Sequence, residues 1–298
     1  MEIDKRKYLK PETIATLANM HLRARMVVEG FIVGLHKSPY HGFSVEFAEH
    51  RAYGPGDDLR HLDWKLYGKT DRFYIKQFEE ETNLKAHLLV DVSNSMGYGS
   101  AGVTKLQYAT YLAAALTYLM LHQQDAVGLT LFDAKIRQHL RPSSRPSTLN
   151  AILSQLEAIE PGPETAVGDS LHHLAERINR RGLVIVISDL FDEPEKILGG
   201  LKHFRHDHHE VILFHILDPQ EIAFSFGAHT KFYDMESGDM LATEPWHIQK
   251  AYQDAVNQFC DTLKTGAREQ NSDYVRLTTD QPLDLALSSY LNKRRRLH

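Results

Sequence analysis

The sequence predicts an α/β protein with a doubly wound, mostly parallel sheet that carries helices on both faces. From Leu84 onward, strand-like and helix-like segments alternate, which is the pattern of such a sheet. The run from Leu183 to Ser188 is apolar and rich in β-branched residues, as in strands that are buried on both faces. A polar Asp-x-Ser-x-Ser turn begins at Asp91, where the first of these strands ends.

The composition is that of a globular protein with one large or two small domains. The chain has 298 residues, 42% of them hydrophobic, which is ample for a core. Its net charge of −5 gives no reason to expect nucleic acid or an anionic membrane as a partner. We expect no export or membrane insertion, because the N-terminus lacks an apolar signal core and the apolar run from Ala109 to Leu121 is too short to span a bilayer. The single cysteine, Cys260, suits the cytoplasm.

We expect residues 1–83 to form an N-terminal extension and residues 84–298 to form the main domain. In the extension, Pro11 opens a helix whose apolar positions recur at helical spacing as far as Phe31. This pattern predicts one amphipathic helix, which must dock on a neighbouring surface.

The rest of the extension is expected to contain a small β element. Apolar and polar residues alternate around Val45, and the segment from Phe73 to Phe78 is also strand-like. Between them lies the charged segment from Gly54 to Trp64. Its paired opposite charges favour a network that fastens the extension, while its Arg and Trp residues leave a partner-binding loop as the alternative.

The main domain is expected to begin with two strands that flank a long helix. The first strand runs from Leu84 to Val92, and the next runs from Ala126 to Asp133. The segment between them, from Thr104 to Gln123, is apolar enough to be a buried helix. A short run from Arg137 to Arg141 is interpreted as an edge strand.

Helices and strands are expected to keep alternating toward the C-terminus. Pro146 and Pro194 stand near the starts of helices, where proline is favoured. The segment from Phe232 to Leu241 has Ser-Gly-Asp at its middle and predicts a small hairpin. The remaining expected elements are helices over 146–159, 166–178, 194–204, 246–269 and from 282, and strands over 183–188, 210–217 and 274–277.

Three loops are expected to meet at the carboxyl edge of the sheet. Asp91, Ser93 and Ser95 supply a carboxylate and two hydroxyls that can face one point beyond the first strand. Thr165 lies just before a helix start, and Asp189 follows an apolar strand, so both are expected at the same edge. Mg²⁺ needs only a few well-aimed oxygens, which makes it the predicted ion, with Mn²⁺ or Ca²⁺ as alternatives. Because hydroxyls are neutral, such an ion keeps positive charge with which to capture an acidic side chain of a partner.

The sequence favours a non-enzymatic, metal-ion-dependent protein-interaction module, with two alternative functions. A phosphatase-like hydrolase would use Asp91, but this design generally needs a second carboxylate two residues on, where the chain has Ser93. A metal-free structural scaffold, with binding by the N-terminal extension, is a further alternative. The histidines of the segment 203–209 are interpreted as solvated rather than as a zinc site, since no cysteine or tight carboxylate pair accompanies them.

The order of these motifs resembles the metal-ion-dependent adhesion site of the von Willebrand factor A fold. Over nearly the whole chain, the sequence also resembles the bacterial family called domain of unknown function 58. The motifs that carry the two resemblances are Asp91-x-Ser93-x-Ser95, Thr165-x-x-Gly168-x-Ser170-Leu171, Asp189, Ser44-Val45-Glu46-Phe47, Arg51-x-Tyr53-x-Pro55-Gly56-Asp57-Asp58-x-Arg60-x-x-Asp63-Trp64, Glu81, and Asp273 through Leu283.

This resemblance implies a partner and a set of roles. The expected partner is an AAA+ ATPase of the MoxR type, with which the chain would act in a chaperone-like manner on the assembly or maturation of a client complex. Ser93, Ser95 and Thr165 would touch the metal, and Asp91 and Asp189 would act partly through water. The chain departs from the adhesion-site pattern at Pro163-Glu164 and at Leu190, where glycines are common.

Overall fold

The computed structural model contains two compact units, Met1–Gly34 together with Leu84–His298, and Leu35–Asn83. Within them it describes residues 10–36, 50–52, 67–68, 74–76, 84–100, 102–162, 167–178, 180–226, 230–233, 240–243 and 245–296. Residues 1–34 therefore belong to the same unit as residues 84–298. No helix in these ranges is long and apolar enough to cross a bilayer.

The described residues of the larger unit form a six-stranded sheet in the order β10-β7-β6-β3-β4-β5. Its strands are β3 (Lys85–Asp91), β4 (Ala126–Phe132), β5 (Ile136–Ser143), β6 (Leu183–Ser188), β7 (Glu210–Leu217) and β10 (Asp273–Thr278). The edge strand β5 runs antiparallel to β4, and the other neighbouring pairs are parallel. The strand order reverses between β3, the first strand, and β6, the fourth. In open α/β sheets, ligands bind beyond the carboxyl ends of the strands at such a reversal.

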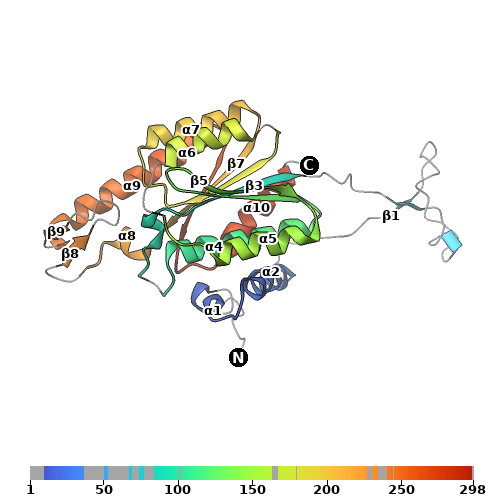
Figure 1. The fold of residues 1–298 in the computed structure, drawn as a ribbon, viewed down its shortest axis with the longest axis horizontal. Helices are drawn as coiled ribbons and strands as arrows, with labels where there is room; N and C mark the ends of the chain where they lie inside the picture. The colour runs from blue at the N-terminus through green and yellow to red at the C-terminus, as the bar shows by residue number, and fades with distance from the viewer. Residues whose placement is uncertain are drawn as a thin grey trace. The chain divides into compact units, whose positions relative to one another are not determined.

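Helices cover both faces of the sheet, as the sequence predicts (Figure 1). The helices α6 (Val167–Arg177), α7 (Pro194–His206) and α9 (Pro245–Glu269) lie over one face. Their apolar residues join those of β3, β4, β6 and β7 in one core cluster. The helices α4 (Lys105–His122), α5 (Pro146–Glu157) and α10 (Asp284–Arg296) lie over the opposite face. The predicted fold class is confirmed.

The helix α4 is the most deeply buried of these elements. The side chain of Thr104 accepts a hydrogen bond from the backbone N–H of Gln107, whose own side chain bonds back, so a capping box begins the helix. Because α4 is apolar on nearly every side, it must be enclosed. The strands β3, β4, β6 and β7 contact it on one side, and the N-terminal helix α1 contacts it as well.

The N-terminal helix docks as expected but is not continuous. We predicted a single helix from Pro11, and this was wrong, since the structure has α1 (Pro11–Ala15) and α2 (Met20–His36). The side chain of Asn19 accepts the N–H of Leu22 at 2.9 Å and so caps a new helix start. The guanidinium of Arg23 donates to backbone carbonyls of the break and stacks over Tyr111 of α4 at 5.2 Å.

Smaller elements complete the fold. The strands β8 (Thr230–Tyr233) and β9 (Met240–Thr243) pair antiparallel, which confirms the predicted hairpin. In the second unit, β1 (His50–Ala52) pairs antiparallel with β2 (Tyr74–Lys76). The strand expected around Val45 and the charged segment 54–64 lie outside the described residues. A short helix, α8 (Pro219–Ala223), follows β7 and was not expected from the sequence.

Candidate metal centre

The first loop gathers the three oxygen groups that the sequence singles out. The carboxylate of Asp91 ends β3 and is 0% exposed. Its Oδ1 accepts the backbone N–H of Ser93 at 2.9 Å, which folds the chain back over the strand tip. A 3₁₀ helix, η3 (Asn94–Gly97), begins immediately afterwards, and the hydroxyls of Ser93 and Ser95 share a hydrogen bond at 3.1 Å. Asp91, Ser93 and Ser95 thus lie together on one side of the turn.

The third loop is joined directly to the first. The hydroxyl of Ser188, the last residue of β6, donates to Asp91 Oδ2 at 2.5 Å and accepts the backbone N–H of Leu190 at 2.9 Å. Leu190 has a φ of 56°, in the left-handed region that glycine adopts without strain. This geometry explains why glycine is common there in the adhesion-site pattern. Leu190 is fully buried, so its core packing offsets the backbone strain.

The second loop touches both of the others on either side of Thr165. Thr165 itself lies outside the described residues. Before it, the N–H of Gly162 donates to Val92 of the first loop at 2.5 Å. After it, the N–H of Gly168 donates to the carboxylate of Asp192 in the third loop at 2.9 Å. The first and third loops are therefore each bonded to the backbone on one side of Thr165, and the place of Thr165 among the metal ligands stays a prediction.

A buried lysine occupies the same edge of the sheet. Lys105, the first residue of α4, is 0% exposed, and its ammonium lies 2.7 Å from Asp189 Oδ2 and 2.6 Å from Glu221 Oε1. Burial lowers the pKa of this ammonium, but the charges of Asp189 and Glu221 outweigh burial and leave the pKa above its ordinary value. Lys105 is therefore a buried cation held between two carboxylates. Asp189, expected among the metal ligands, already has a positively charged partner.

The helix α8 fixes the second carboxylate that Lys105 contacts. Asp218 caps this helix, and Oε2 of Glu221 accepts the N–H of Asp218 at 2.7 Å, which completes a capping box. The carboxylate of Asp218 also accepts the backbone N–H of Ser100 at 2.7 Å. The first loop is thereby tied to the end of β7. Asp-Pro-x-Glu is a recognisable helix start, so this signal was present in the sequence.

Negative charge exceeds positive charge in this buried region. Among the described residues, the carboxylates of Asp91, Asp189, Asp218 and Glu221 lie at this edge, and the ammonium of Lys105 is bonded to two of them, Asp189 and Glu221. Asp91 is bonded to neutral donors, the Ser93 amide and the Ser188 hydroxyl. Burial, together with the nearby charge of Asp189, raises the pKa of Asp91 to about 7. A hard divalent cation fits this donor set, since it takes oxygen ligands and would neutralise the uncompensated carboxylate.

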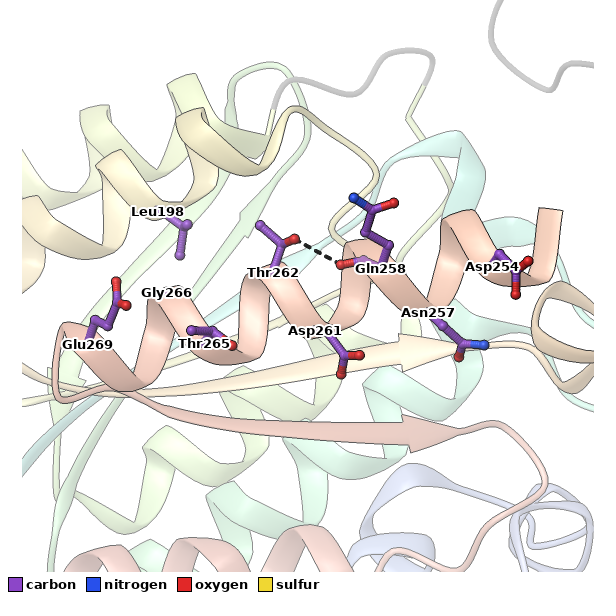
Figure 2. A pocket seen from close by; sticks show the side chains of 9 residues that line it. All are labelled: Leu198, Asp254, Asn257, Gln258, Asp261, Thr262, Thr265, Gly266 and Glu269. Atoms are coloured by element: carbon purple, nitrogen blue, oxygen red, sulfur yellow. Dashed lines mark hydrogen bonds between the residues drawn. The ribbon is translucent and has the colours of Figure 1, made fainter. Parts of the chain in front are cut away.

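Two other features lie apart from this centre. In the segment 203–209, His209 is buried and bonds to the carbonyl of Ile178 at 2.9 Å, whereas His206 is exposed beside Asp207. A groove of about 700 Å³ runs along α9. Figure 2 shows the polar side chains of α9 that line it, together with Leu198 of α7. Neither feature shares a residue with the network around Lys105.

The sheet with this centre at its switch point is of the von Willebrand factor A type. The chain belongs to the family described as protein of unknown function DUF58, whose family model matches residues 49–259. Uncharacterized proteins of Mycobacterium tuberculosis and Mycobacterium bovis are 26% identical to it over 231 residues, which cover 76% of this chain and 72% of theirs. Both the predicted family and the predicted fold type are confirmed.

Solved structures agree in fold. The conserved hypothetical protein BatB from Bacteroides thetaiotaomicron is 18% identical, with a TM-score of 0.52 over 72% of this chain and 99% of the chain in that structure. An aerotolerance-related membrane protein from Bacteroides fragilis is 19% identical, with a TM-score of 0.51 over 70% of this chain and 99% of the chain in that structure. At these identities the likeness concerns the fold alone.

Proposed function

We propose that this chain is a non-enzymatic, metal-ion-dependent protein-interaction module. One observation carries the proposal. The switch point of the sheet holds a buried carboxylate, Asp91, that lacks a charged partner among the described residues and lies beside the hydroxyls of Ser93 and Ser95. Such a set of oxygens attracts a hard divalent cation, for which Mg²⁺, Mn²⁺ and Ca²⁺ are the candidates.

In this proposal, the residues of the three loops divide the work of holding the ion. Asp91, Ser93 and Ser95 supply oxygens, and Thr165 is assigned to the same set. Ser188 fixes the orientation of Asp91 through its hydrogen bond. When bound, the ion supplies a Lewis-acidic centre that accepts a carboxylate oxygen from another molecule. Asp189 does not bind the ion directly in this proposal, because its Oδ2 is paired with the ammonium of Lys105.

The proposed partner is a MoxR-type AAA+ ATPase, acting with this chain on the assembly or maturation of a client that presents an acidic side chain. The resemblance to the DUF58 family supports this assignment, and an ion held at the carboxyl edge of the sheet would lie where open α/β sheets bind their ligands. We propose the cytoplasm as the location, because the single cysteine calls for no oxidising compartment.

An interaction role is preferred to phosphatase chemistry for a geometric reason. A nucleophilic aspartate must present a free oxygen to the phosphorus atom. Both oxygens of Asp91 accept hydrogen bonds, from Ser93 and Ser188, and the side chain is 0% exposed. This arrangement suits a residue that supports a site better than one that attacks a substrate.

The test compares wild type with Asp91→Ala and with the isosteric Asp91→Asn. Mg²⁺ should raise the melting temperature of wild type, because a ligand that binds the folded state stabilises it, and should have little effect on either variant. In a pull-down with a MoxR-type ATPase, a chelator and both substitutions should weaken capture. The matched control is Asp254→Asn, which removes an exposed carboxylate on α9.

Two results would contradict the proposal. Partner capture that survives both the chelator and the Asp91 substitutions would favour the metal-free scaffold. Turnover of a phosphoester that Asp91→Ala abolishes would instead favour the hydrolase.

A further inference from the structure

Lys105 is a buried charged group at the same edge of the sheet as Asp91 and Asp189. It is 0% exposed, and α4 holds it at its first turn, where Thr104 caps the helix. The ring of Phe191 covers the ammonium at 4.5 Å from the ring centroid. A buried ammonium is costly unless it is paired, so its two carboxylate partners define its position.

Lys105 pairs with only one of the two aspartates of the predicted metal site, Asp189 and not Asp91. Its ammonium takes Asp189 Oδ2 at 2.7 Å. Asp91, at the end of the neighbouring strand, receives hydrogen bonds from the amide of Ser93 and the hydroxyl of Ser188. Asp189 is therefore compensated by a fixed positive charge, and Asp91 is not.

We propose that Lys105 is a positioning residue that withholds Asp189 from the metal centre and thereby keeps the affinity for the ion low. The inference rests on the proposed function. With Asp189 paired to Lys105, Asp91 is the carboxylate of the proposed ligand set that has no charged partner among the described residues. Asp91 balances one of the two positive charges of the ion, and the other is left for a partner's carboxylate. Retention of the ion consequently depends on that partner, so metal and partner bind cooperatively.

Glu221 competes with Asp189 for the ammonium of Lys105 and so limits how strongly Lys105 binds Asp189. Its Oε1 lies 2.6 Å from the ammonium, and its Oε2 is held by the N–H of Asp218. Because the capping box fixes Glu221, this carboxylate draws Lys105 partly away from Asp189. Removing the charge of Glu221 should leave Lys105 more strongly bound to Asp189, and removing the ammonium should release Asp189 to the ion.

These two changes predict shifts of opposite sign, which a purely structural role would not produce. The probe is Mn²⁺ alone, with the free ion measured by electron paramagnetic resonance. The double variant Lys105→Met/Glu221→Gln keeps the net charge of the pair and should bind Mn²⁺ at least about tenfold more tightly than wild type. The variant Glu221→Gln alone should bind Mn²⁺ at least about threefold more weakly than wild type. The matched control is Lys202→Met, which removes an exposed lysine of α7 and should leave the affinity unchanged.

The outcomes separate this inference from the proposed function. If wild type binds Mn²⁺ and the double variant, folded by circular dichroism, binds no more tightly, the inference is overturned and the proposed function stands. If the double variant fails to fold, Glu221→Gln decides, because unchanged or tighter binding overturns the inference. Binding by the double variant but not by wild type supports the inference and removes the metal from the proposed function. Absence of binding in every variant overturns both.

Discussion

The hydroxyl of Ser188 should contribute more to stability than its size suggests, because it joins two of the three loops. It makes two buried hydrogen bonds, one to the carboxylate of Asp91 and one from the N–H of Leu190. A hydrogen bond to a charged group contributes roughly 1.5–3 kcal/mol, and an unpaired buried amide costs about 1–3 kcal/mol. Ser188→Ala should therefore lower the free energy of unfolding by about 3 kcal/mol.

The assay is thermal unfolding, followed by circular dichroism with a chelator present so that no metal contributes. A loss of this size corresponds to a fall of roughly 6–12 °C in melting temperature for a domain of this length. The matched control is Ser272→Ala. Ser272 is 5% exposed, and its hydroxyl has no hydrogen-bond partner among the described residues, so its removal should be nearly neutral. If Ser188→Ala lowers the melting temperature no more than Ser272→Ala does, the claim that Ser188 joins the first and third loops is refuted.

Two further predictions concern pH and a close backbone approach. Burial lowers the pKa of His87 to about 4, so the unfolded chain binds the proton first and stability falls as the pH drops from 6.5 toward 4. The raised pKa of Asp91 acts in the opposite direction below pH 7. The assay is metal-free chemical denaturation at pH 7 and at pH 5. Between these pH values, His87→Gln should lose roughly 2 kcal/mol less stability than wild type, and Asp91→Asn roughly 2 kcal/mol more. The same change of unfolding free energy with pH in all three proteins would contradict both pKa shifts. Gly162→Ala should destabilise by about 1–3 kcal/mol, because its Cβ would collide with the Asp133 carboxylate. Gly68→Ala, where a Cβ meets none of the described residues within 4 Å, should be neutral in the same thermal assay.

Much of the main domain is readable from the sequence, because strand and helix periodicity is local. The β-branched run 183–188 is a fully buried strand, and the run that ends at Asp91 is the central strand β3. The N-terminal helix shows the limit of this reasoning. Its apolar spacing continues through residues 16–19, but a capping side chain, Asn19, and the docking of Arg23 on α4 break it.

The sequence by itself determined the fold class, the strand ends at which polar loops emerge, and the grouping of Asp91 with Ser93 and Ser95, because each depends on residues that are close in the chain. Only the tertiary structure decided which charges meet there. Lys105 lies 84 residues from Asp189 and 116 residues from Glu221. A lysine at the first position of a helix ordinarily faces water, and it is buried here because the strand order carries the ends of β6 and β7 to the start of α4. Electrostatic pairing across such separations has no local pattern, since it arises only when the sheet has formed.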